Sequence, residues 1–182
     1  MIHKCLLQTE GSQITFELEK ATEQHFNLAI QFALDAHLGG YSLHSPPTFI
    51  STSDIQRLIA YFEQHIAYLR TNPDHESQPF VPMELGFQLQ ALAGELYPDD
   101  DGEFTLRFMI NVGKSSTEET SVYVGSETVV MLTNLRHFIA SLRDAKSRMP
   151  YVSHAYAATN GHHTLSNGVS SVRAFSDRTS IE

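Results

Sequence analysis

The ten histidines are the first residues of this sequence that could do chemistry, because imidazole binds metals and transfers protons near neutral pH. A zinc site needs three or four ligands at close spacing, commonly two histidines four residues apart on a helix. No H-E-x-x-H sequence occurs, and the neighbours His162 and His163 would point to opposite sides of an extended segment. His65 and His137 fall on different predicted helices. We therefore expect no metal and no other cofactor.

A run of acids, Asp99, Asp100 and Asp101, followed by Gly102 and Glu103, is the next candidate. A calcium loop needs oxygen ligands at alternate positions over about twelve residues, ending in a bidentate glutamate. Here the acids are contiguous, and no such glutamate follows. The run is better explained as a solvated turn between two strands, and its charge could face a protein partner.

Nucleophilic catalysis has no recognisable signature in this sequence. Cys5 is flanked by lysine and leucines, without a group that would favour its thiolate. There is no G-x-S-x-G turn, and Gly113-Lys114-Ser115 lacks the preceding glycine of a phosphate-binding loop. The sequence therefore predicts a protein that is not an enzyme. A histidine-dependent metal-binding or small-molecule enzyme stays open as an alternative.

A long connection over residues 39–47 carries an aromatic ring, a histidine and two prolines. Loops of this kind often carry binding residues, because a rigid scaffold presents them to solvent. Together with the acidic run, this loop completes the predicted partner-binding set, which is Asp99, Asp100, Asp101, Glu103, Tyr41 and His44.

Two segments have the apolar spacing of amphipathic helices. Residues 53–71 repeat apolar side chains every three or four positions, and Ser51, Thr52 or Ser53 can cap the N-terminus. Residues 127–146 repeat the pattern, with Ser126 as the predicted cap. Both helices follow an extended segment and a few small polar residues, so one strand-to-helix arrangement occurs twice.

Elsewhere the apolar period is two, which indicates strands with one buried face. The connections are mostly too short for parallel crossovers, so we expect antiparallel pairing. The alternating apolar positions are 14–18, 26–34, 83–89, 104–112 and 122–124, with a further short strand near 48–51.

These elements predict an α+β fold, in which a mostly antiparallel sheet of five or six strands and two amphipathic helices form two layers. Residues 1–146 form the single domain. Residues 147–182 lack a sustained period and form an irregular C-terminal extension, for which Tyr151, Val152, Tyr156 and Phe175 are the expected anchors.

The net charge of -9 lies entirely in residues 1–150, which hold ten Lys/Arg and nineteen Asp/Glu. An acidic body disfavours nucleic acid, because neutralising phosphates requires clustered lysine and arginine. No apolar run approaches the roughly 18 residues of a membrane span. The single cysteine cannot form an internal disulfide, so we expect a cytoplasmic protein. The acidic charge favours a basic protein partner, and we expect binding to neither nucleic acid nor membrane.

The layout resembles that of small immunity proteins encoded beside bacterial wall-associated and other polymorphic toxins. The resemblance covers residues 14–146: a strand pair, a helix that opens at Ser53-Asp54-Ile55, a strand meander from Met83 to Val124, and a closing helix from Glu127. It implies a non-catalytic inhibitor that covers a toxin's active site. A structural subunit that forms homo-oligomers through a sheet edge is the third interpretation.

Overall fold

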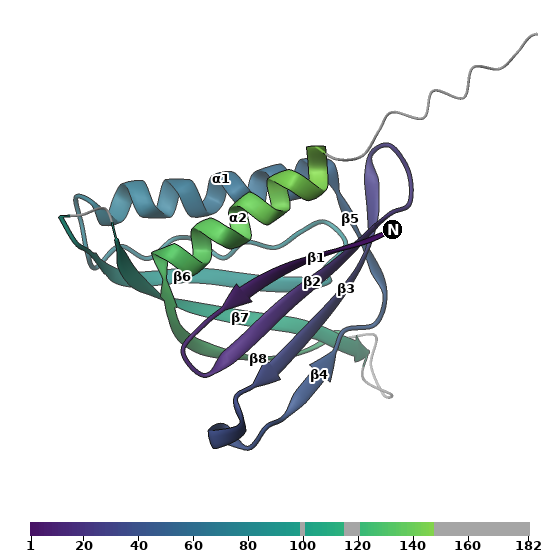
Figure 1. The fold of residues 1–182 in the computed structure, drawn as a ribbon, viewed down its shortest axis with the longest axis horizontal. Helices are drawn as coiled ribbons and strands as arrows, with labels where there is room; N and C mark the ends of the chain where they lie inside the picture. Colours follow the sequence, from purple (N-terminus) through teal and green to yellow (C-terminus); the bar gives the residue numbers. More distant parts are fainter. Residues whose placement is uncertain (99–100, 115–120, 148–182) are drawn as a thin grey trace, which may run out of the picture. The chain divides into compact units, whose positions relative to one another are not determined.

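The structure is a computed structural model that describes residues 1–98, 101–114 and 121–147, all within one unit, Met1–Tyr151. From residue 148 on, the predicted C-terminal extension and its four anchors lie outside the described residues. Along the chain the elements are β1 (Ile2–Gln8), β2 (Ser12–Lys20), β3 (His25–Leu34), the short 3₁₀ helix η1 (Ala36–Leu38), β4 (Ser42–His44), β5 (Thr48–Ser51), α1 (Thr52–Leu69), β6 (Phe87–Leu96), β7 (Gly102–Lys114), β8 (Ser121–Met131) and α2 (Leu132–Ser147) (Figure 1).

The strands form two sheets, and all their described ladders are antiparallel. Sheet A has five strands in the order β1-β2-β3-β4, with β5 also paired to β3, and sheet B has three in the order β6-β7-β8. The α+β class, the two helices and the antiparallel pairing are confirmed. Instead of the predicted single sheet of five or six strands, there are two sheets: the strands before α1 form sheet A, and those after it form sheet B.

The two sheets and both helices enclose one apolar core, in which Phe16 of β2 has a central position. Its ring centroid lies 5.0 Å from that of Phe87 in β6, 6.1 Å from Phe108 in β7 and 5.4 Å from Phe138 in α2. Phe62 of α1 joins the same group, with its ring centroid 6.5 Å from that of Phe138. The inward-facing half of each alternating strand pattern therefore meets at this aromatic cluster.

Helix α1 begins as the sequence predicts. Ser51 has an extended backbone, and its side-chain oxygen accepts a hydrogen bond of 2.9 Å from the backbone N–H of Asp54. The buried carboxylate of Asp54 accepts a hydrogen bond from the Ser51 hydroxyl and pairs with Arg57 at 2.6 Å. Ser51 is thus the N-cap, and Asp54 places negative charge at the positive end of the helix dipole.

Replacing Ser51 with alanine should lower the free energy of unfolding by about 1 kcal/mol, because the N–H of Asp54 loses its acceptor. Urea denaturation would measure the change. Ser53→Ala is the matched control, since Ser53 is exposed and lies only two residues further along, in the first turn of the same helix. Equal losses in the two variants would contradict the capping role of Ser51.

Helix α2 begins at Leu132, five residues later than predicted, and Ser126 lies inside β8 rather than at a helix N-terminus. The reason is the ladder with β7, in which Arg107 pairs with Glu127 and Glu103 pairs with Met131. The β-branched run 128–130 also favours a strand. As expected, both helices directly follow a strand, α1 after β5 and α2 after β8.

Two further strand boundaries differ from the prediction. Met83 is 81% exposed, and Leu85 has a φ of 52°, so residues 82–85 form a turn and β6 begins only at Phe87. Strand β1 was not predicted, because Cys5, Leu6 and Leu7 are consecutive apolar residues that hide the alternation. In the structure Cys5 and Leu7 are buried, and Leu6 faces outward.

Candidate functional site

Of the predicted acidic residues, Asp99 and Asp100 lie outside the described residues, whereas Asp101 and Glu103 flank the start of β7. The backbone N–H of Tyr97 donates to the carbonyl oxygen of Asp101 at 2.8 Å, which closes the turn between β6 and β7. Glu95 is the direct cross-strand neighbour of Glu103. Like charges in this position repel each other, so this turn places two carboxylates side by side at a cost in stability.

Tyr97 stands among these carboxylates with 44% of its surface exposed. The charge of Glu103 is the main cause that raises the Tyr97 pKa, followed by burial and by the charges of Glu95 and Asp101. We call Glu95, Tyr97, Asp101 and Glu103 the acidic turn. Sequence reasoning missed the tyrosine, although its position two residues before the acidic run was a usable signal.

The other two predicted contact residues lie elsewhere. Tyr41 precedes β4 and is 56% exposed, while its carbonyl oxygen accepts a 2.8 Å hydrogen bond from Leu34 N–H. His44 is exposed at the end of β4. The η1–β4 region and the β6–β7 turn lie at separate places in Figure 1. The structure therefore does not bring Tyr41 and His44 to the acidic turn.

A second candidate site is a pocket that the sequence did not predict. It has a volume of about 580 Å³ and lies between one face of α1 and the segment 75–80. Below we call it the α1 pocket. Its wall on the helix comes from positions 57, 60, 61, 64 and 68, which share one helix face because they are three or four residues apart.

Hydrogen bonds fix the floor of the α1 pocket. Ser77 Oγ lies 3.0 Å from Nδ1 of the fully buried His65 and 3.5 Å from Nε2 of His75. The backbone N–H of Ala91 donates to the Tyr61 hydroxyl oxygen at 2.8 Å, and that of Ser77 donates to the Ala91 carbonyl oxygen at 2.9 Å. Helix, segment and β6 are thus tied together at this floor.

The pair of Ser77 and His65 has the residue types of a nucleophile and its base, but the wrong electrostatics. Burial is the main cause that lowers the pKa of His65 to about 4, and the nearby charge of His75 adds to it. A general base works best with a pKa near the working pH. The ring of His65 also lies 4.9 Å from that of Phe104 in the core, so it is suited to hold Ser77 in place.

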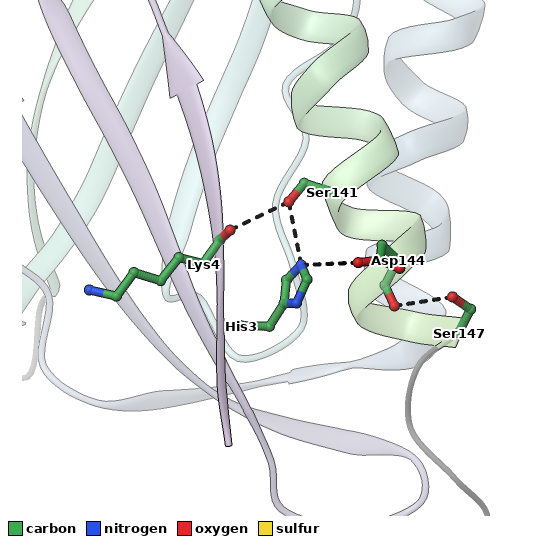
Figure 2. Close-up of polar contacts among 5 residues, drawn as sticks. All are labelled: His3, Lys4, Ser141, Asp144 and Ser147. Atoms are coloured by element: carbon green, nitrogen blue, oxygen red, sulfur yellow. Dashed lines mark hydrogen bonds and ion pairs between the residues drawn. The ribbon is translucent and has the colours of Figure 1, made fainter.

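A third polar group, shown in Figure 2, contains His3, Ser141 and Asp144. A catalytic triad uses both imidazole nitrogens, one toward the serine and one toward the carboxylate. Here the same Nε2 of His3 faces Ser141 Oγ at 3.4 Å and Asp144 Oδ2 at 4.0 Å. Ser141 also approaches the carbonyl oxygen of Lys4 at 3.4 Å, so these contacts connect β1 with α2. Burial raises the pKa of the adjacent Cys5 thiol, with a smaller opposing effect of Ser141.

Histidine, cysteine, aspartate and glutamate side chains are the possible metal ligands among the described residues. No group of three or more His, Cys, Asp or Glu side chains comes together there in a way that could hold a metal ion. Within residues 1–98, 101–114 and 121–147, neither helix combines the length and apolarity needed to cross a membrane. His162 and His163 lie outside the described residues.

No family model, curated protein or solved structure matches the chain. By its geometry the protein belongs to the class of α+β proteins with two antiparallel sheets and two helices. Its two candidate sites are the acidic turn and the α1 pocket.

Proposed function

We propose that this protein is a non-catalytic, cytoplasmic protein-binding domain whose acidic turn contacts a basic protein partner. The observation that carries the proposal is an exposed tyrosine, Tyr97, on a turn that also carries three carboxylates, those of Glu95, Asp101 and Glu103. Tyrosine is enriched among the residues that dominate binding energy, because its ring buries much area at a low entropic cost. Carboxylates around it would select a partner rich in lysine or arginine.

The arrangement of the acidic turn supports a role in binding rather than in folding. Glu95 and Glu103 repel each other across the β6–β7 ladder, and this lowers the stability of the free protein. Oδ1 of Asp101 is buried without a hydrogen-bond partner among the described residues, which adds a second cost. A cationic side chain from a partner would relieve the repulsion between Glu95 and Glu103.

The resemblance to immunity proteins suggests which partner this is. In that interpretation the partner is a basic toxin made by the same bacterium, and the protein inhibits it by covering the toxin's active site. Acidic charge in residues 1–150 would speed the encounter with a basic toxin, because complementary charges steer association. A toxin gene immediately upstream of the coding sequence would identify the partner to test.

Glu103→Lys should separate binding from folding. We expect it to slow association with the toxin domain by about 3- to 10-fold at low salt, because it reverses one charge of the acidic turn. The same change should raise the free energy of unfolding by about 0.5 kcal/mol, since it turns the Glu95 repulsion into an attraction. Stopped-flow association and urea denaturation measure the two effects.

The matched control is Glu23→Lys, an equal change in net charge at an exposed position between β2 and β3. It should alter association by less than about 2-fold, because electrostatic steering depends on where the charge lies. If both variants slowed association equally, only net charge would matter, and the acidic turn would not be the contact surface.

A further inference from the structure

We infer that the α1 pocket is a recognition site for a guanidinium group, namely an arginine side chain of the partner protein. This inference rests on the proposed function only for the source of the arginine, because the pocket itself can be tested with a small probe. The juxtaposition that suggests it is an aromatic wall, an exposed carboxylate and a neutralised Arg57 within one pocket.

Four rings form the walls of the α1 pocket. Tyr68 and His75 lie with their centroids 4.5 Å apart and an interplanar angle of 34°, while Tyr61 and Phe80 lie 5.7 Å apart. The faces of the tyrosine and phenylalanine rings carry partial negative charge and attract cations. A guanidinium is planar and weakly hydrated, so it stacks on such faces more readily than an ammonium group does.

One guanidinium group already packs on an aromatic ring in the α1 pocket. The guanidinium carbon of Arg57 lies 5.3 Å from the ring centroid of Phe80. Arg57 does not make the pocket cationic, because Asp54, whose side chain is only 3% exposed, pairs with it at 2.6 Å. The guanidinium of a ligand can therefore enter the α1 pocket without being repelled by an unpaired charge on Arg57.

The remaining polar lining can supply several hydrogen-bond acceptors to such a group. Glu76 brings an exposed carboxylate to the rim, and Gln64 and Gln78 bring amide oxygens from opposite walls. A guanidinium has five N–H donors in a fixed fork and no acceptor, so it can use several of these oxygens at once. A carboxylate ligand would meet Glu76 instead, which argues against an anionic occupant.

The wall opposite α1 is held in position before any ligand arrives. Phe80 forms an isolated antiparallel bridge with Leu89 of β6, with N–H to oxygen distances of 2.7 and 3.0 Å. Ser77 is fixed by Ala91 and His65. A preformed site loses less entropy on binding. A volume of about 580 Å³ admits an arginine side chain together with a neighbouring peptide group.

The test is a titration of the ¹⁵N-labelled full chain with N-acetyl-arginine methylamide, followed by NMR. We expect saturable shifts at residues 57–80, with a dissociation constant on the order of 1 mM, since a single side chain has few atoms to contribute. The lysine analogue should bind at least about 3-fold more weakly, because it cannot stack as a plane. The norleucine analogue has no cation and should produce no saturable shift.

Two variants locate the site. Glu76→Gln should weaken arginine binding by about 3- to 10-fold, and Tyr68→Ala should weaken it by at least as much, because each removes one attraction of the cation. Glu84→Gln, an equal change at an exposed position of the turn before β6, should leave it unchanged. Both pocket residues are exposed, so the variants should fold.

Each outcome decides between specific alternatives. Equal binding of the norleucine analogue would show a merely apolar pocket, and absence of saturation by the arginine probe up to about 50 mM would overturn the inference. Arginine binding combined with an unaffected toxin association in Glu103→Lys would retain the pocket and remove the acidic turn. The reverse pattern would retain the acidic turn and remove the pocket.

Discussion

Phe16→Ala should lower the free energy of unfolding by about 3–5 kcal/mol, the range for removing a phenyl ring from a packed core. Phe16 is 1% exposed, and its ring contacts those of Phe87, Phe108 and Phe138. These neighbours belong to β6, β7 and α2, which cannot all move into the space because each is held by its own sheet or helix. A large cavity should therefore remain, and urea denaturation would measure the loss.

Phe49→Ala is the matched control for this prediction. Phe49 lies on β5, next to the start of α1, and is 50% exposed. Its removal should cost less than about 1 kcal/mol, because little apolar surface leaves the protein interior. If Phe16→Ala cost no more than Phe49→Ala, Phe16 would not join the two sheets and α2 as described.

The strands that the sequence predicted well are those with one fully buried face. Positions 14, 16 and 18 of β2, and the even positions 104–110 of β7, all point into the core, so their period of two reports the structure directly. The start of α2 was misplaced because the ladder with β7 keeps residues 127–131 extended. That ladder is a tertiary contact, and local helical spacing carries no information about it.

The division into two sheets was also beyond local patterns, because alternation shows that a strand has a buried face but does not show which strand lies opposite it. The two candidate sites differ in the same way, because one is local in the sequence and the other is formed by tertiary contacts. Asp101 and Glu103 could be found because they adjoin in sequence, whereas the α1 pocket joins Tyr61 and Tyr68 to His75 and Ser77. Tertiary contacts of the segment 75–80, both with β6 and with α1, place its side chains opposite this helix.

Between pH 6.5 and 4 the protein should lose stability as the pH falls, and His65 should account for about 3 kcal/mol of that loss. In the folded protein burial is the main cause that lowers the pKa of His65 from 6.5 to about 4, the charge of His75 acts in the same direction, and the Leu92 backbone offsets only part of the shift. The unfolded chain therefore takes up a proton at a higher pH than the folded chain. Protonation favours unfolding from about pH 6.5 downward, and the effect levels off below pH 4, where both states are protonated.

His65→Leu isolates this contribution, because it replaces the titrating imidazole beside Phe104 with an apolar side chain. The variant will lose the hydrogen bond to Ser77, so its stability at pH 7.5 should be lower by about 1–2 kcal/mol. Between pH 6.5 and 4, however, its stability should fall less steeply than that of the unmodified protein. His37→Gln, at an exposed position of η1, should keep the original pH dependence. Urea denaturation at a series of pH values would decide, and parallel curves for His65→Leu and the unmodified protein would mean that His65 accepts a proton equally well in the folded state, in conflict with its burial beneath the α1 pocket.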